Sequence, residues 1–153
     1  MWKRLISFAI FLAYSALLVK VMVFKGLPVI RLGHLIFKFG GADANGQANF
    51  IPLKTILPYV FGYKGLIIAG INLAGNIGLL VPIGLLAPFV FRNMTWQKSL
   101  VLAVSPGLII EGMQVIFRVG IFDIDDVILN GLGVMIGYWM AKTLLRIIGK
   151  QSK

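Results

Sequence analysis

The sequence predicts an all-α fold: an integral membrane bundle of about four transmembrane helices, with a long loop after the first span. Apolar residues make up 59% of the 153 residues and charged residues only 13%, whereas soluble globular proteins carry roughly 45–50% and about 25%. The apolar residues also gather in four runs, each long enough for a helix to cross a hydrocarbon core of about 30 Å. At this length we expect a single domain covering residues 1–153.

The four runs cover residues 5–24, 66–91, 99–117 and 127–145. The first is interrupted only by Lys20, whose ammonium group can extend to the nearer interface. Pro82 and Pro88 in the second run predict kinks, which neighbouring helices make tolerable in a membrane. In the fourth run, Gly133 and Gly137 form a G-x-x-x-G pair, which predicts close packing against another helix.

Residues 25–65 form the loop between the first two spans, and a Gly-rich polar stretch at 40–49 divides it into two semi-apolar pieces. Loops of this length without structure of their own are uncommon. We therefore expect a short amphipathic or interfacial element at Leu35–Phe39 or at Leu53–Phe61.

The formal charge of +10 comes from 15 Lys and Arg against 5 Asp and Glu. Because the chain has no base-reading motif, we expect no nucleic-acid partner and interpret the basic residues as topology determinants and contacts to anionic lipid headgroups. Cytoplasmic segments are rich in Lys and Arg, so the N- and C-termini are predicted in the cytoplasm. The basic residues on that side are Lys3, Arg4, Arg92, Lys98, Lys142, Arg146, Lys150 and Lys153.

Ionisable and amide side chains recur at helical spacing near the ends of the last three spans. A charge inside a span costs roughly 2.5–3.5 kcal/mol, so each needs a partner or a function. Three sets each share one helix face: Asn72 with Asn76, Glu111 with Gln114 and Arg118, and Asp123 with Asp126 and Asn130. In a four-span bundle all of them fall in one half of the membrane, which is the outer half when the N-terminus is cytoplasmic.

Each set also has a purely structural interpretation. The two asparagines of the second span can bridge helices. Glu111 and Arg118 can form one buried ion pair that fixes the register of the helices. Asp123 and Asp125 can belong to a solvated turn.

Four sequence blocks resemble the VanZ-like family: N-F-I-P-L-K-T-I (49–56), N-L-A-G-N-I-G-L-L-V-P-I-G (72–84), E-G-M-Q (111–114) and R-V-G-I-F-D-I-D-D-V-I-L-N-G-L-G (118–133). The resemblance covers residues 49–138 and departs visibly only at Leu80, where the family often has Phe. It implies a helical protein of the bacterial inner membrane, and the family's named member is associated with resistance to the lipid-bearing glycopeptide antibiotic teicoplanin. The matched functional positions, all candidate ligand-binding residues except the proline, are Asn72, Asn76, Pro82, Glu111, Gln114, Arg118, Asp123, Asp125, Asp126 and Asn130.

Three functions remain open at this point. The first is a non-catalytic factor that binds or rearranges an outer-leaflet ligand, such as a membrane lipid, a lipid-linked cell-wall precursor or a lipoglycopeptide. In it Arg118 would grip a phosphate. Hydrogen bonds would come from Asn72, Asn76 and Gln114.

The second is a membrane-embedded enzyme that acts on a lipid-linked phosphate. Its candidate catalytic residues are Glu111, as the general base, with Asp123 and Asp126. Asp123, Asp125 and Asp126 are candidate ligands of a divalent cation, although no hydroxyl, Cys or His nucleophile stands beside them. The third is a small transporter whose path would be lined by intramembrane acids and completed by a homo-oligomer.

Overall fold

The structure is a computed structural model that describes residues 2–23, 30–32, 35–37, 47–61, 66–91 and 93–151. Its elements, in chain order, are α1 (Trp2–Val23), β1 (Ile30–Leu32), β2 (Leu35–Phe37), α2 (Ile56–Val60), α3 (Leu66–Val90), α4 (Trp96–Ile116) and α5 (Ile124–Gln151). Helices α1, α3, α4 and α5 are each long and apolar enough to cross a membrane. This confirms the predicted all-α membrane bundle.

The long helices differ from the predicted spans by a few residues at their ends, because caps rather than hydrophobicity set the boundaries. Helix α5 begins at Ile124 instead of residue 127, since the carboxylate of Asp123 accepts a hydrogen bond from the backbone N–H of Asp125 (2.9 Å). Helix α4 begins after Thr95, whose hydroxyl accepts a hydrogen bond from the N–H of Lys98 (3.3 Å).

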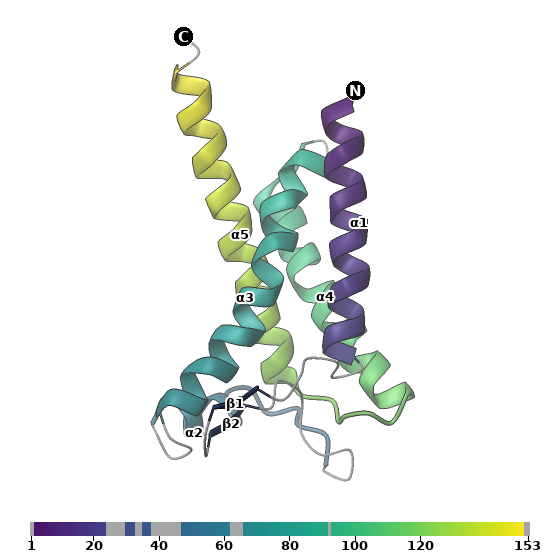
Figure 1. Ribbon diagram of the computed structural model, residues 1–153, viewed down its shortest axis with the longest axis vertical. Helices are drawn as coiled ribbons and strands as arrows, with labels where there is room; N and C mark the ends of the chain where they lie inside the picture. Colours follow the sequence, from purple (N-terminus) through teal and green to yellow (C-terminus); the bar gives the residue numbers. More distant parts are fainter. Residues whose placement is uncertain are drawn as a thin grey trace.

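The described part of the loop between α1 and α3 contains two short structures. Strands β1 and β2 form an antiparallel hairpin that pairs Ile30 with Phe37 and Leu32 with Leu35. The element expected at Leu35–Phe39 is therefore a strand, consistent with the β preference of its Ile and Phe residues. The second expected element, at Leu53–Phe61, contains α2. In Figure 1 the hairpin and α2 lie at one end of the bundle and both chain termini at the other.

Helices α3 and α5 run toward the same end of the bundle and cross near its middle (Figure 1), and three glycines bring their backbones into contact there. A Cβ atom on Gly133 or Gly137 would lie 2.1 or 2.0 Å from a backbone oxygen of α3. A Cβ atom on Gly84 would lie 1.9 Å from a backbone oxygen of α5. Only residues without a Cβ allow this approach, as the G-x-x-x-G pair predicted.

Side-chain hydrogen bonds attach α1 to α3. The hydroxyl of Tyr14 donates to the carbonyl oxygen of Leu79 (2.7 Å). At the other end of α1, Nε of Arg4 donates to the carbonyl oxygen of Val90 (3.1 Å), which is the last residue of α3. Val90 belongs to the last turn of α3, whose carbonyl oxygens have no partner within the helix, and Arg4 supplies one.

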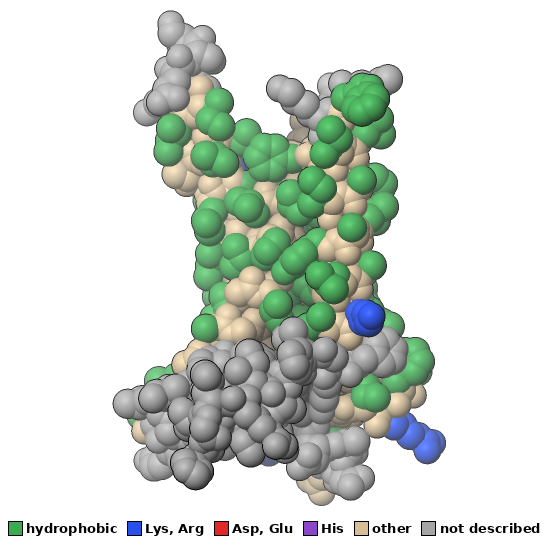
Figure 2. Space-filling model, in the orientation of Figure 1, with side chains coloured by type: hydrophobic (Ala, Val, Ile, Leu, Met, Phe, Trp, Pro, Cys, Tyr) green, Lys and Arg blue, Asp and Glu red, His purple; other side chains and the backbone are tan. Residues whose placement is uncertain are grey.

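Large apolar side chains cover the outside of the helices. Val101 and Ile116 are 70% and 75% exposed, and Figure 2 shows hydrophobic side chains spread over the middle of the bundle. The inside is filled by a buried apolar cluster of Leu18, Val23, Leu80, Ile83, Ala103, Ile110 and Val134. Such an exterior matches lipid as its solvent, and the chain is a multi-pass membrane protein.

We expect Gly137→Ala to lower the free energy of unfolding by about 3 kcal/mol, the upper part of the range for overpacking. The new methyl group would stand 2.0 Å from the backbone oxygen of Val81, which cannot swing aside as a side chain can. Unfolding in mixed detergent micelles measures the effect. Gly78→Ala is the matched control, because a Cβ there meets nothing within 4 Å, and it should gain up to about 1 kcal/mol of helix propensity. Equal stability of the two variants would contradict the packing.

Candidate functional site

The candidate site lies where α4 ends, α5 begins and the loop segment 47–61 crosses the end of the bundle (Figure 1). A parallel β-bridge joins Asn49 to Asp123. In it the N–H of Asn49 donates to the carbonyl oxygen of Phe122 (2.8 Å), and the N–H of Ile124 donates to that of Asn49 (2.9 Å). The loop segment and the turn before α5 therefore form one unit, although 74 residues separate them in sequence.

Asp125 is fully buried, and its carboxylate holds the loop segment. Its Oδ1 accepts a hydrogen bond from the N–H of Leu53. Its Oδ2 accepts from the N–H and hydroxyl of Thr55 (both 2.7 Å) and from the N–H of Ile56 (3.2 Å). Leu53 has a φ of 68°, in the left-handed region that Leu rarely adopts. This sharp bend aims three N–H groups at one carboxylate, which caps α2 from another helix.

Asp123 and Glu111 extend the network to α4. Oδ1 of Asp123 accepts hydrogen bonds from Nδ2 of Asn49 and from the N–H of Asp125 (both 2.9 Å). The N–H of Asp123 donates to Oε2 of Glu111 (2.8 Å), a side chain only 1% exposed. Oδ1 of Asn49 accepts from the N–H of Ile51 (3.2 Å). Asp123 therefore lies in a hydrogen-bonded and buried turn, and the interpretation of this turn as solvated is wrong.

Gln114 binds the end of α1. Its Nε2 donates to the carbonyl oxygen of Met22 (3.0 Å), in the last turn of that helix. Gly120 packs against the same side chain, since a Cβ on it would lie 2.6 Å from Oε1 of Gln114. The side chain is 3% exposed. The side-chain amide of Gln114, which was predicted to donate a hydrogen bond to a ligand, thus donates to the protein itself.

Two further polar side chains face the inside of the bundle from α5. Oδ1 of Asp126 accepts a hydrogen bond from Nδ2 of Asn76 (2.8 Å), which links α5 to α3. One turn along, Asn130 is fully buried, and within the described part of the chain neither its Oδ1 nor its Nδ2 has a hydrogen-bond partner. Burying an amide in this way costs roughly 1–3 kcal/mol. A residue that served only packing would avoid this cost.

Arg118 occupies a backbone position that usually belongs to glycine. Its φ is 55°. Its N–H donates to the carbonyl oxygen of Val115 (3.1 Å), and the N–H of Val119 donates to that of Gln114 (2.9 Å). These two bonds form a Schellman motif, whose left-handed residue follows the helix end. The Arg118 side chain is exposed, ready to meet a molecule outside the bundle.

Two sequence-based interpretations of Arg118 are therefore wrong. It does not share a helix face with Glu111 and Gln114, because α4 ends at Ile116 and the left-handed turn redirects the chain. Nor does it form a buried ion pair with Glu111, because that carboxylate is buried whereas the guanidinium is exposed.

The three acids at the start of α5 face different partners. Asp123 binds Asn49, Asp125 binds the loop, and Asp126 binds Asn76. Among the described residues, no group of three His, Cys, Asp or Glu side chains could hold a metal ion. The divalent cation considered for the enzyme hypothesis thus gains no support from this geometry.

A sequence model of the VanZ/LLP1 family matches residues 11–146. The chain belongs to the VanZ/LLP1 family. Comparisons with curated proteins and with solved structures give no match. In this VanZ-like chain, two of the blocks that carry the resemblance, 49–56 and 118–133, are the two sides of the network just described.

The VanZ-like site contains most of the predicted residues and two that were missed. The side chain of Asn72 lies outside the described residues. The missed residues are Asn49 and Thr55, which bind Asp123 and Asp125. The signal for them was present, because both lie in the first block of the resemblance on either side of Pro52.

We expect Asp125→Asn to release the loop segment of this VanZ-like protein. An amide keeps one acceptor oxygen, so at least one buried N–H loses its partner at a cost of about 1–3 kcal/mol. Hydrogen exchange at the amides of Thr55 and Ile56 should accelerate by about tenfold or more. Asp126→Asn is the control, because it keeps an acceptor for Asn76 and does not touch these amides. Unchanged protection in Asp125→Asn would show that the carboxylate does not hold the loop.

Proposed function

We propose that this VanZ-like protein acts at the outer half of the bacterial inner membrane. It binds an amphiphilic ligand there, a lipid, a lipid-linked cell-wall precursor or a lipoglycopeptide, and so contributes to teicoplanin-type resistance. Both termini lie in the cytoplasm in this proposal. The basic residues near the termini and the α3–α4 turn support that orientation, because cytoplasmic segments carry an excess of Lys and Arg. The candidate site then opens to the outside.

The observation that carries the proposal is the apolar surface of the loop segment 47–61. Phe50 and Phe61 are 70% and 69% exposed, and the other exposed apolar side chains of the segment are Ile51, Leu53, Leu57 and Val60. The ring of Phe50 stacks on Phe122 with 5.2 Å between centroids, so this surface reaches the turn before α5. Lys54, on the same segment, is also exposed.

Apolar surface beside exposed cations suits an amphiphile. An acyl group can rest on the phenylalanines of the loop segment, as the apolar face of an interfacial element rests in lipid. Arg118, exposed at the same end of the bundle, can bind a phosphate or carboxylate through two parallel N–H bonds. Teicoplanin-type antibiotics and lipid-linked precursors both combine these two features.

The buried acids support a binding role over the two alternatives. The oxygens of Asp125 already accept four hydrogen bonds, and Oε2 of Glu111 positions the N–H of Asp123. A general base needs an oxygen within reach of a substrate proton, and these oxygens bind the protein instead. A transport path between α3 and α5 is opposed by their backbone contacts at Gly84 and Gly137.

The outer placement predicts which positions a membrane-impermeant maleimide reaches. The chain has no cysteine, so Lys54→Cys and Gln97→Cys each introduce a single thiol at an exposed position. In intact spheroplasts we expect labelling at position 54 and none at position 97. After permeabilisation both should react to a similar extent. Labelling at position 97 and none at position 54 would place the site on the cytoplasmic side and contradict the proposal.

The role of Arg118 can be separated from its effect on folding. Glycine relieves the left-handed strain of about 1 kcal/mol, so Arg118→Gly should be at least as stable as the native protein while losing the cation. We expect teicoplanin resistance to fall to the level of a deletion strain, together with surface binding of a fluorescent lipoglycopeptide. Arg118→Lys, which keeps the charge and the strain, should retain part of both. Full resistance in Arg118→Gly at native protein levels would rule out this role.

A further inference from the structure

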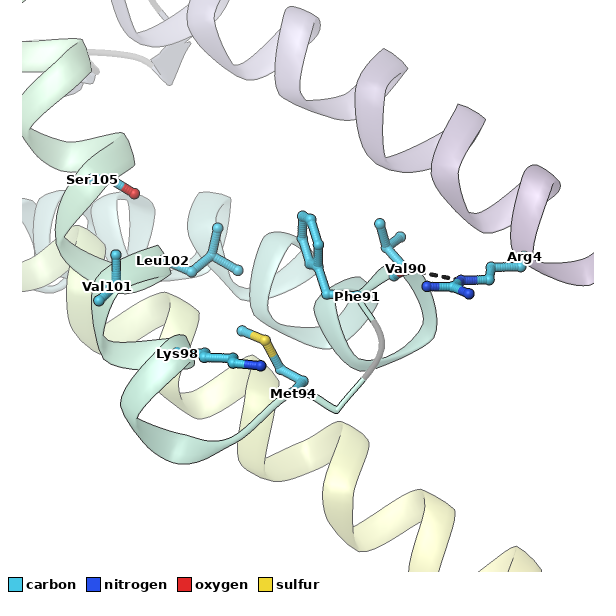
Figure 3. Close-up of a pocket in the computed structure, with 8 residues that line it drawn as sticks. All are labelled: Arg4, Val90, Phe91, Met94, Lys98, Val101, Leu102 and Ser105. Atoms are coloured by element: carbon cyan, nitrogen blue, oxygen red, sulfur yellow. Dashed lines mark hydrogen bonds between the residues drawn. The ribbon is translucent and has the colours of Figure 1, made fainter.

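At the end of the bundle opposite the candidate site, a groove of about 380 Å³ lies between α1, the α3–α4 turn and α4 (Figure 3). Its walls are mainly apolar and include Phe91, Val101 and Leu102. Its polar residues include Arg4 from α1 and Lys98 from α4. The volume falls in the range of roughly 300–1,000 Å³ that is typical of sites for small organic molecules.

A second groove, of about 590 Å³, adjoins the first. The two grooves share Arg4, Val90 and Phe91, and the second continues along α1 past Leu5 and Phe8. Phe91 is held in place by an edge-on contact with the ring of Phe11 on α1, at 5.6 Å between centroids. Arg4 therefore borders both apolar grooves, and the side chain of Phe91 lies where they meet.

Arg4 and Lys98 are each held by a hydrogen bond to a backbone carbonyl, and neither has an acidic neighbour in sequence. Arg4 Nε donates to the carbonyl oxygen of Val90 (3.1 Å), and Lys98 Nζ donates to that of Asn93 (3.2 Å). In Figure 3 both side chains extend toward the α3–α4 turn, from opposite sides. No Asp or Glu occurs in residues 1–42, 44–110 or 127–153. The remaining N–H groups of both side chains can therefore bind an anion.

Tryptophans place this end at a membrane interface. Trp2 and Trp96 are 76% and 52% exposed, in the first turns of α1 and α4. Tryptophan collects at the headgroup level of membranes. Arg4 and Lys98 are each two residues further along the same helices, and their long side chains can reach back to the level of the lipid phosphates.

We infer that these grooves bind one anionic phospholipid, with its phosphate between Arg4 and Lys98 and one acyl chain in each groove. Two apolar grooves beside a shared cation match a two-chain lipid, and two uncompensated positive charges favour a net negative headgroup. This site lies at the other end of the bundle from the proposed antibiotic or precursor site. Its test therefore does not depend on the proposed function.

The probe is palmitoyl-oleoyl phosphatidylglycerol, with the phosphatidylcholine of the same chains as the zwitterionic comparison. Each is titrated into delipidated full-length protein in detergent, and bound lipid is counted by native mass spectrometry. We expect one phosphatidylglycerol to bind at least about fivefold more tightly than phosphatidylcholine. Equal binding of the two lipids would overturn the inference.

Two variants test the charge and the groove separately. Lys98→Gln should weaken phosphatidylglycerol binding by about fivefold, whereas Lys142→Gln, outside both grooves, should not. Val101→Trp should fill the first groove and abolish the binding of phosphatidylglycerol. Val104→Trp is its control, because Val104 is 45% exposed on the same helix and lines neither groove. Native binding by both Lys98→Gln and Val101→Trp would overturn the inference, and if Val101→Trp does not fold, Lys98→Gln decides.

Discussion

The arrangement of the candidate site depends on the carboxylate of Asp125. Its oxygens accept hydrogen bonds from the loop segment, in a chain that has few other carboxylate side chains. Near a membrane every backbone N–H that leaves water needs a partner. Asp125 serves the N–H groups of Leu53, Thr55 and Ile56, and it reaches them because Asp123 caps α5 and is itself held by Glu111. The exposed surface of the loop segment follows from this buried arrangement.

The sequence predicted the features that are local to one helix. Span number follows from the length of the apolar runs, and the contact at Gly133 and Gly137 follows from the absence of two Cβ atoms. The pairing of Asn49 with Asp123 crosses 74 residues and follows no periodicity. The sequence placed the end of the third span at residue 117 but gave no sign of the left-handed turn at Arg118, because such a residue is signalled by Gly and not by Arg. Gln114 binds a backbone carbonyl, which has no sequence signature.

Two positions keep residues that are unfavourable for stability. Arg118 holds a left-handed conformation that glycine would adopt more easily, and Asn130 buries an amide that lacks a partner among the described residues. Strain of this kind tends to persist at functional sites because selection for function outweighs the small loss of stability. Both residues lie near the end of the bundle that carries the acid network, whereas the glycine contacts between α3 and α5 lie nearer its middle and follow packing rules closely. The unfavourable positions thus gather where α4 ends and α5 begins, beside the acid network.

The long reach of the Asp125 hydrogen bonds also constrains the order of assembly during synthesis. The N–H groups of the loop leave the ribosome about 70 residues before their acceptor does, since the bonds to Leu53 and Thr55 span 72 and 70 residues. Helix α3 also lacks its main backbone partner at first, because α5 is synthesised after α3 and α4. Until α5 inserts, α3 and α4 stand in the membrane without their principal contact, and the loop has no cap. Insertion of α5 is therefore the step that supplies both the acceptors of the loop and the backbone partner of α3.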